Sequence, residues 1–207
     1  MQDKILELKK LEEEIKSCTK CSLWKTKKNY VVGEGNPDAK LMFIGEAPGR
    51  EEDIQGRPFV GSAGKLLTEL IENVIGLKRE DVYIANVLKC RPPNNRDPRP
   101  EEIKACTPYL IRQIDLINPS FIVCLGRYSA KFIFDLFNLK FTNITKVKGK
   151  IFEVIRSDGS VLQIMATYHP AAVLYRPILK DEYIKDFEKI AEALERKKKT
   201  KTLFDFT

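Results

Sequence analysis

Four short runs of apolar residues, each with at least one β-branched member, are spaced along the chain, at residues 41–45, 82–87, 121–125 and 162–167. Each run is apolar at nearly every position and does not alternate with polar residues. This pattern is typical of strands that are covered on both faces. We therefore expect the four runs to form one buried sheet.

Apolar residues at helical spacing lie before, between and after these runs. They predict an opening amphipathic helix that ends near Ser17, and further helices at residues 62–75, 100–117, 127–137 and 184–194. Ser62 is suited to begin the second helix, Gly76 to end it, and Pro100 to start the third. A turn-forming Ser-Asp-Gly within residues 149–161 predicts a small hairpin.

Strands that alternate with helices predict an α/β fold, in which helices cover both faces of a parallel sheet. In such folds, ligands bind beyond the carboxyl ends of the strands. Each predicted strand runs directly into a polar or Gly/Pro-rich segment. In chain order these segments are GEAPGREED, NVLKCRPPNNRDPRP, GRYSA and YHPAAVLYRP. They are therefore the places where we expect the functional residues.

The composition is that of a globular protein, with 43% apolar and 31% charged residues in a chain of 207. We expect a single domain over residues 1–195 and a basic, flexible tail over residues 196–207. No apolar run approaches the ~20 residues that span a bilayer, and the charged N-terminus differs from a secretory signal. These features predict a cytoplasmic protein without a membrane partner. Abundant Lys and Glu with few Gln are typical of thermophiles.

The net charge of +7 is weak support for nucleic-acid binding, because the tail alone holds five Lys/Arg and one Asp. The other 195 residues thus carry only +3. A lysine-rich end is usually a solvated end. Charge by itself therefore gives nucleic acid only a slight preference over other partners.

Four of the five cysteines form a candidate metal site. Cys18 and Cys21 form a C-x2-C pair after the first helix, while Cys90 and Cys106 follow the second strand. The fifth, Cys124, lies inside an apolar strand and is expected to be a core residue. Four thiolates suit either a tetrahedral zinc ion or a [4Fe–4S] cluster, and the spacing does not separate the two. The site would join the N-terminal helix to the middle of the chain.

Three residues at the strand ends are candidates for ligand chemistry. His169 is the only histidine and directly follows the fourth strand. Phe59 stands between Pro and Gly in GRPFVGSAG, outside any apolar period, and could stack on a flat ligand. Asn86 lies near the end of an apolar strand, where a buried amide needs a partner and can both donate and accept. The glycines of GEAPG allow a ligand to approach the backbone closely.

These motifs together resemble the family 4 uracil-DNA glycosylases of thermophilic bacteria and archaea. The resemblance rests on GEAPG-x2-ED, GRPFVG-x-AG, the strand that ends in Asn86, KCRPPNNR, YHP and the four cysteines, in this order, over residues 15–195. It implies a three-layer α/β/α sandwich with a mostly parallel four-stranded sheet. It also implies that the cofactor is a [4Fe–4S] cluster and the substrate is single- or double-stranded DNA that contains uracil.

The resemblance further implies the roles of the candidate residues. Phe59 would stack on a flipped uracil, Asn86 would bind its O4/N3 edge, and the backbone of Glu46, Ala47 and Pro48 would line its O2 side. His169 would donate to O2 as a neutral imidazole while the glycosidic bond breaks.

The sequence defines less well which residues position the attacking water and which exclude the 5-methyl group of thymine. Ala47 stands where a family 1 enzyme has its water-positioning aspartate, so Glu46, Asn95 or backbone carbonyls are the candidates for that task. Glu52 is the candidate for excluding the 5-methyl group of thymine. Glu46 also favours uracil over a wider substrate range.

Two further segments are expected to contact partners. The HPAAVLYRP segment resembles a loop that wedges the minor groove, with Val173 or Leu174 as the wedge. Basic side chains would bind phosphates, namely Lys89, Arg91, Arg96 and Arg99. Residues 200–207 resemble a degenerate sliding-clamp peptide. We expect a monomer.

Three other functions fit parts of the sequence. A glycosylase of the same fold could act on hypoxanthine or G·T mismatches. A non-catalytic iron–sulfur module that binds nucleic acid would leave His169 and Asn86 unexplained. An iron–sulfur electron carrier would need a partner or a second cofactor, for which the sequence shows no signal.

Overall fold

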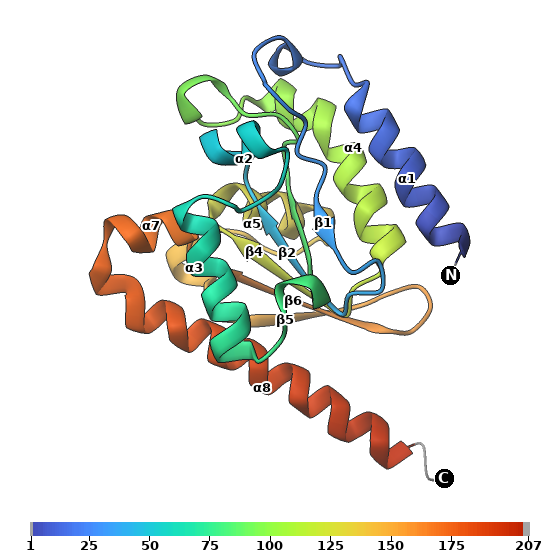
Figure 1. Ribbon diagram of the computed structural model, residues 1–207. Helices are drawn as coiled ribbons and strands as arrows, with labels where there is room; N and C mark the ends of the chain where they lie inside the picture. Colours follow the sequence, from blue (N-terminus) through green and yellow to red (C-terminus); the bar gives the residue numbers. More distant parts are fainter. Residues whose placement is uncertain (1, 205–207) are drawn as a thin grey trace.

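One six-stranded sheet lies at the centre of the protein, whose computed structural model describes residues 2–204 and the side chains of residues 3–196. The strands follow the spatial order β1-β3-β2-β4-β6-β5 (Figure 1). Their bounds are β1 Glu34–Gly35, β2 Leu41–Gly45, β3 Tyr83–Asn86, β4 Phe121–Leu125, β5 Ile151–Ile155 and β6 Val161–Thr167.

The four central strands are parallel and are the four that the sequence predicts. Their register places Gly45 opposite Asn86 and Leu125 opposite Thr167, so the ends of the strands meet at one edge. Both outer strands are antiparallel to their neighbours. Strand β5 pairs with β6 as the predicted hairpin, whereas β1 was not predicted. The fold class is therefore confirmed, and the sheet has two strands more than expected.

Helices cover both faces of this sheet and connect its strands. The α-helices are α1 Gln2–Lys16, α2 Arg50–Gln55, α3 Ser62–Leu70, α4 Pro100–Ile117, α5 Arg127–Leu136, α6 Ile144–Val147, α7 Pro170–Tyr175 and α8 Lys180–Phe204. A π-helical turn η2 (Ile71–Ile75) extends α3. Short 3₁₀ turns occur at η1 Ser22–Lys25, η3 Arg79–Asp81, η4 Pro93–Asn95 and η5 Pro177–Leu179. The short helices α2, α6 and α7 were not predicted.

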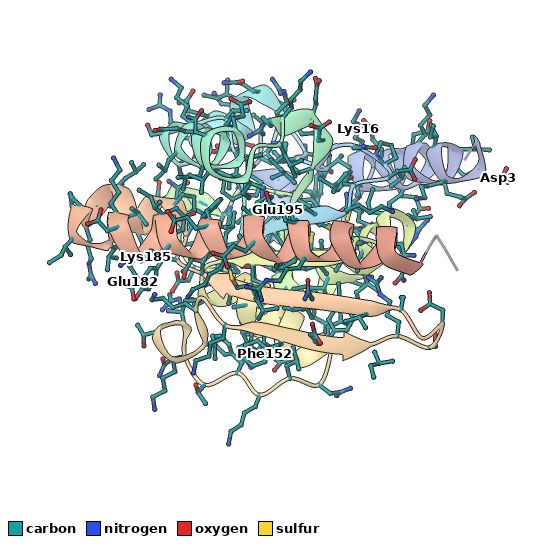
Figure 2. All side chains as sticks on the ribbon, turned by 90° about the horizontal axis from the view of Figure 1, so that it is seen from below. Asp3, Lys16, Phe152, Glu182, Lys185 and Glu195 are labelled. Atoms are coloured by element: carbon teal, nitrogen blue, oxygen red, sulfur yellow. The ribbon has the colours of Figure 1, made fainter. Side chains whose placement is uncertain are left out.

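Two hydrophobic layers hold the helices onto the sheet. On one face, α1, α4 and α5 pack on Met42, Ile44 and their neighbours. On the other face, α3, η2 and α8 pack on Leu41 and Phe43. Odd and even positions of the same strand thus serve opposite layers, as expected for a sheet that is buried on both sides. Viewed from below in Figure 2, α8 runs between α3 and the β5–β6 hairpin.

The ends of the long helices follow local sequence signals. Pro100 occupies the first turn of α4, where its missing N–H costs nothing. Gly76 ends the helical segment after η2 with a φ of 75°, a left-handed conformation that glycine adopts without strain.

The C-terminal segment continues α8 as far as Phe204. The predicted clamp peptide at residues 200–207 concerns side chains outside the described residues and stays a prediction. Within residues 2–204, no helix has both the length and the apolar character that crossing a membrane would require.

Candidate active site

The carboxyl ends of β2, β3 and β6 bring three predicted residues together. Gly45 closes β2 and pairs with Asn86 at the end of β3. A Cβ atom placed on Gly45 would lie 2.3 Å from Asn86 Oδ1 and 2.6 Å from the Phe59 ring. The Phe59 ring in turn lies 5.6 Å from the imidazole of His169. The sequence motifs on these separate segments thus meet in one place.

Asn86 is buried with an unsatisfied oxygen. Its exposed fraction is 1%, and Oδ1 accepts no hydrogen bond from any described residue. A buried polar atom without a partner costs about 1–3 kcal/mol, so native structures keep few of them. The absence of a side chain on Gly45 allows this oxygen and the Phe59 ring to lie directly against the end of β2. Asn86 Oδ1 is therefore free to accept a hydrogen bond from an N–H group of a ligand.

Phe59 adopts a strained backbone conformation beside this acceptor. Its φ is 51°, in the left-handed region that bulky residues rarely enter. The conformation is held by close packing, because a Cβ atom on Gly64 would lie 1.9 Å from the carbonyl oxygen of Phe59. Strain of this kind concentrates at functional sites. It seats the ring against Gly45 and near His169, as a stacking residue requires.

His169 is held in one tautomer. It precedes the first residue of α7, and its Nδ1 accepts a hydrogen bond of 3.2 Å from the backbone N–H of Ala171. The ring proton is therefore on Nε2. Burial lowers the pKa of His169 to about 4, against a smaller opposing effect of Glu52. The imidazole is neutral at physiological pH and can act as a hydrogen-bond donor, as the sequence analysis proposed.

A hydrogen bond to α8 fixes the end of β6, the strand that precedes His169. Thr167 donates a hydrogen bond of 2.7 Å to the buried carboxylate of Asp186. This bond anchors β6 two residues before His169. The sequence analysis missed Asp186, because it lies within an ordinary amphipathic helix and has no distinguishing sequence signal.

Glu46 directly follows β2 and is half-buried. Burial raises its pKa to about 7, with a further contribution from Asp97 and an opposing one from Arg127. Asp97 and Arg127 form an ion pair of 2.6 Å. A carboxyl group with this pKa can exchange a proton near neutral pH. The Asp97–Arg127 pair was not predicted, because the two residues lie on segments far apart in the sequence.

Glu52 connects two turns of the candidate site through hydrogen bonds with the backbone. Its two carboxylate oxygens accept hydrogen bonds from the backbone N–H groups of Gly49 (3.1 Å), Val60 (2.8 Å) and Gly61 (2.9 Å). These bonds connect the turn after β2 to the turn that carries Phe59. They hold the Glu52 carboxylate between the two turns, and its role as a wall against the thymine methyl group stays a prediction.

Asn95 lies on the surface. Its Oδ1 accepts a hydrogen bond of 2.7 Å from Arg91 Nε, and its φ is 54°. Ala47 and Pro48 lie in the turn after β2, where Pro48 is buried and Ala47 is half-buried. The roles predicted for these three residues stay predictions.

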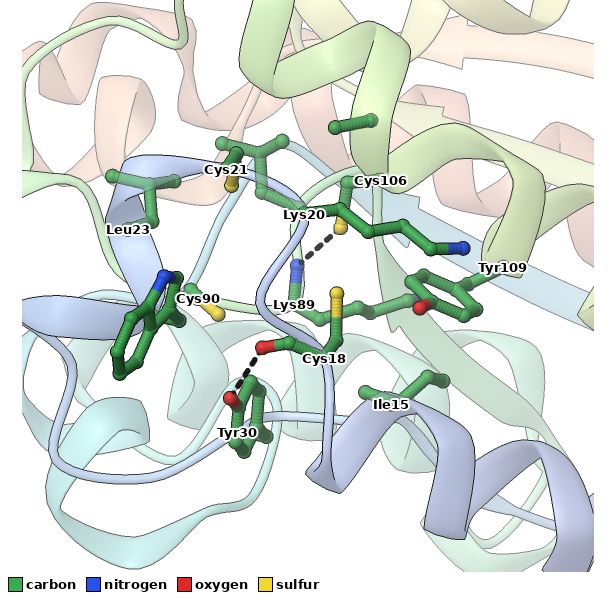
Figure 3. A pocket seen from close by; sticks show the side chains of 13 residues that line it. Ile15, Cys18, Lys20, Cys21, Leu23, Tyr30, Lys89, Cys90, Cys106 and Tyr109 are labelled. Atoms are coloured by element: carbon green, nitrogen blue, oxygen red, sulfur yellow. Dashed lines mark hydrogen bonds between the residues drawn. The ribbon is translucent and has the colours of Figure 1, made fainter.

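The four predicted cysteine ligands line one hollow between the end of α1, η1 and the start of α4 (Figure 3). The backbone N–H of Lys89 points at the Cys106 sulfur at 3.2 Å. Burial raises the pKa of the Cys106 thiol to about 11 and also raises those of Cys21 and Cys90. Among the residues with described side chains, no three His, Cys, Asp or Glu converge closely enough to bind a single metal ion. Cys124 is a buried core residue in β4.

Lys89 is buried, so the prediction that it binds a phosphate is wrong. Its exposed fraction is 1%. Its ammonium group donates to the carbonyl oxygen of Asn86 (2.9 Å) and to Oε1 of Gln113 (2.6 Å). Burial lowers its pKa to about 8. Lys89 thus connects the strand end at Asn86 to helix α4.

The other predicted DNA contacts differ in exposure. Arg99 is exposed, while Arg96 forms a two-pronged ion pair with the buried Glu102. Val173 is only 3% exposed and packs in the core under α3, so it cannot be a wedge. Leu174 is 47% exposed, and the sequence analysis missed its neighbour Tyr175, which is 87% exposed. An aromatic residue next to Leu174 in this short segment between two prolines was the available signal.

Comparisons with known proteins agree with this geometry. Residues 32–195 match the family model described as the uracil DNA glycosylase superfamily. The chain is 62% identical to the type-4 uracil-DNA glycosylase of Archaeoglobus fulgidus, over 93% of this chain and 95% of that protein. It is 54% identical to the type-4 enzyme of Sulfurisphaera tokodaii (89% and 84%) and 49% identical to that of Thermotoga maritima (79% and 81%).

Proposed function

The chain belongs to the uracil DNA glycosylase superfamily and to its type-4 family, and we propose that it removes uracil from DNA in base excision repair. It hydrolyses the N-glycosidic bond and leaves an abasic site. The observation that carries this proposal is the buried, unpartnered Oδ1 of Asn86 between Gly45 and Phe59.

Asn86 can select uracil by hydrogen bonding. The N3–H group of uracil would donate to Oδ1, and the amide of the same side chain would donate to O4. Cytosine has no proton on N3 and carries an amino group at C4, so it would leave both groups of Asn86 mismatched. An unpaired buried group is costly enough to reject the wrong base. The base reaches Asn86 only after it has left the base stack of the DNA. The Phe59 ring would then supply a new surface for the base to stack on.

His169 would stabilise the leaving group. As the glycosidic bond breaks, the sugar becomes an oxocarbenium ion and uracil becomes an anion. The Nε2–H group of His169 donates to O2 of this anion, and the hydrogen bond from Ala171 keeps the proton on that nitrogen. A fixed donor at a developing charge accelerates the reaction without transferring a proton.

Glu46 is our candidate for activating the water that attacks the sugar. This role predicts an acid limb in the pH profile of the single-turnover rate. Because the carboxylate form is required and its pKa is about 7, activity should rise with pH and level off above 7. Each unit below that value should reduce the rate about tenfold.

The Glu46→Gln variant provides the matched control, since it keeps the shape of the side chain and does not titrate. We expect a slower enzyme whose profile is flat between pH 5 and 7. If the variant retained the acid limb, another group would be responsible for it. His169 should contribute nothing in this range, because it is neutral throughout.

The four cysteines fit a [4Fe–4S] cluster, which we propose as the cofactor. The supporting observations are four thiols around one hollow and a backbone N–H directed at the Cys106 sulfur. Each thiolate of such a cluster binds a different iron atom, so the four need not converge as the ligands of one zinc ion do. The bound cluster would act as a structural cross-link between α1 and α4. Iron and sulfide analysis of the purified protein tests this proposal.

Leu174 is our candidate for the wedge in double-stranded DNA, and Leu174→Ala separates it from Val173. The variant should excise uracil from a duplex about tenfold more slowly and from a single strand at the normal rate, because only a duplex must be unstacked. Val173→Ala should instead lower the free energy of unfolding by about 1–2 kcal/mol through lost burial. Equal loss on both substrates for Leu174→Ala would contradict its role as a wedge.

The function itself is tested by measuring free uracil released from a single-stranded oligonucleotide with one deoxyuridine. Matched oligonucleotides carry deoxycytidine, thymidine or hypoxanthine at the same position. We expect release from the deoxyuridine substrate only. Binding without release would contradict the enzymatic function, and release of hypoxanthine would favour the broader glycosylase.

A further inference from the structure

A lysine-rich segment surrounds the hollow that the cysteines line. Residues 16–28 contain five lysines and no carboxylate. Lys16 pairs with Glu12. Within the part of the chain whose side chains are described, the other four (Lys20, Lys25, Lys27 and Lys28) form no ion pair. This lysine segment therefore carries a positive charge that the protein does not neutralise.

Three of these lysines lie over aromatic rings. The ammonium nitrogen of Lys20 is 4.7 Å from the centre of the Tyr109 ring, that of Lys25 is 5.8 Å from Trp24, and that of Lys27 is 3.8 Å from Tyr30. Cation–π contacts hold a side chain in place without cancelling its charge. The lysines are thus partly ordered before any ligand binds, which reduces the entropy that binding would cost.

The segment is fixed beside the candidate active site. The backbone N–H groups of Lys28 and Asn29 donate to Oδ1 of Asp53 at 2.8 and 3.3 Å. The Asn29 side chain also donates to the carbonyl oxygens of Asp53 and Ile54 at 2.9 Å. Asp53 is buried and belongs to α2, which starts directly after the turn that follows β2. Figure 1 shows this blue loop after α1 at the same end of the molecule as α2.

An exposed aromatic ring accompanies the lysines. Trp24 is 39% exposed, although it lies among residues that line the cysteine hollow. Proteins that bind single strands combine a basic track with aromatic rings on which bases stack. A series of lysines without carboxylates, fixed beside a pocket for a DNA base and next to an exposed indole, matches this combination.

We propose that the lysine segment binds the phosphate backbone of the DNA strand that carries the target base. This surface rests on the proposed function and extends it, because it lies outside the pocket and replaces the contact that the buried Lys89 cannot make. Lys20, Lys25 and Lys28 are exposed and form the contact. Lys27 is half-buried near Cys90 and supports the segment.

The test compares two triple variants with the same loss of charge. One is Lys20→Gln, Lys25→Gln and Lys28→Gln. The control is Lys140→Gln, Lys146→Gln and Lys150→Gln, three exposed positions around α6. The dissociation constant for a uracil-free single-stranded oligonucleotide is measured against salt concentration. Visible absorbance is compared among all proteins, so that loss of a cofactor is not mistaken for loss of a contact.

We expect the slope of log affinity against log salt to fall by about 2 in the first variant, since each single-strand phosphate contact contributes about 0.7. When the salt concentration rises fourfold, the affinity of the wild type should therefore fall by a factor roughly 16 times larger than that of this variant. The control should keep the wild-type slope and the wild-type rate of uracil release.

An unchanged slope in the first variant, or an equal loss in the control, would overturn the proposed surface. The same preparations are assayed for uracil release. Because binding is measured on uracil-free DNA, a wild-type protein that binds but releases no uracil would contradict the proposed function and not the surface. The two failures are therefore distinguishable.

Discussion

Replacing His169 with alanine should lower the single-turnover rate of uracil release by about 100- to 1000-fold, the usual effect of removing one hydrogen-bond donor from a developing anion. The Nε2–H group is held in place by the Ala171 hydrogen bond, and the low pKa keeps the ring neutral. The loss should appear in the chemical step, because the donor acts when charge forms on the base. Single-turnover kinetics at saturating DNA measure that step directly.

The variant also removes a helix cap, so a second substitution is needed. His169 precedes α7 and accepts from its second N–H group. Asparagine is a good N-cap residue and can keep this hydrogen bond, but its shorter side chain does not reach the place of Nε2. His169→Asn should therefore be nearly as stable as the wild type and as slow as His169→Ala. Near-normal activity of His169→Asn would show that capping, and not donation, is the role of His169.

Asn86→Leu should lower kcat/KM for uracil by roughly 100- to 1000-fold while leaving the protein at least as stable. The leucine side chain has a similar volume and removes both hydrogen bonds to the base, which are the basis of recognition. In the free protein, however, Asn86 Oδ1 has no partner among the described residues. Replacing it should raise the free energy of unfolding by about 1 kcal/mol, because the unsatisfied buried group is gone.

Because Asn86→Leu should lower activity but raise stability, a general loss of folding cannot produce the expected result. Thermal or urea unfolding gives the stability, and uracil release gives the activity. A variant that lost both would indicate that Asn86 serves the core. If the variant kept its activity, Asn86 would not be needed for recognition of the base. Phe43→Leu, in the core under α8, is a suitable control that should lose stability and keep activity at low temperature.

The sequence predicted the central sheet well, because its strands are buried on both faces and stand out as continuous apolar runs. Two of the four parallel strands, at residues 41–45 and 121–125, have the predicted bounds. Strand β1 was not predicted, because it has only two residues, Glu34 and Gly35, and pairs with a single neighbour at the edge of the sheet. Helix α7 was taken for a loop because its segment resembles a minor-groove loop, although Pro170 suits the first turn of a helix.

Residue types predicted the members of the site better than their roles. His169 and Asn86 were found from their positions at strand ends, which the topology of a parallel sheet determines. Lys89 and Val173 were assigned to DNA, yet both are buried in the protein. Which way a side chain points depends on packing between distant segments, and no local pattern in the sequence carries that information.

The two glycines that seat Phe59 offer a way to interpret other sequences of this kind. Position 45 has no room for a methyl group beside Asn86, and position 64 has none beside the Phe59 carbonyl. A homologous chain with alanine at either position must place its aromatic ring elsewhere, so its pocket has a different shape. Such a chain should be assayed against larger or altered bases before it is assigned to uracil. Two positions without a side chain therefore indicate whether another chain can hold its aromatic ring where Phe59 lies here.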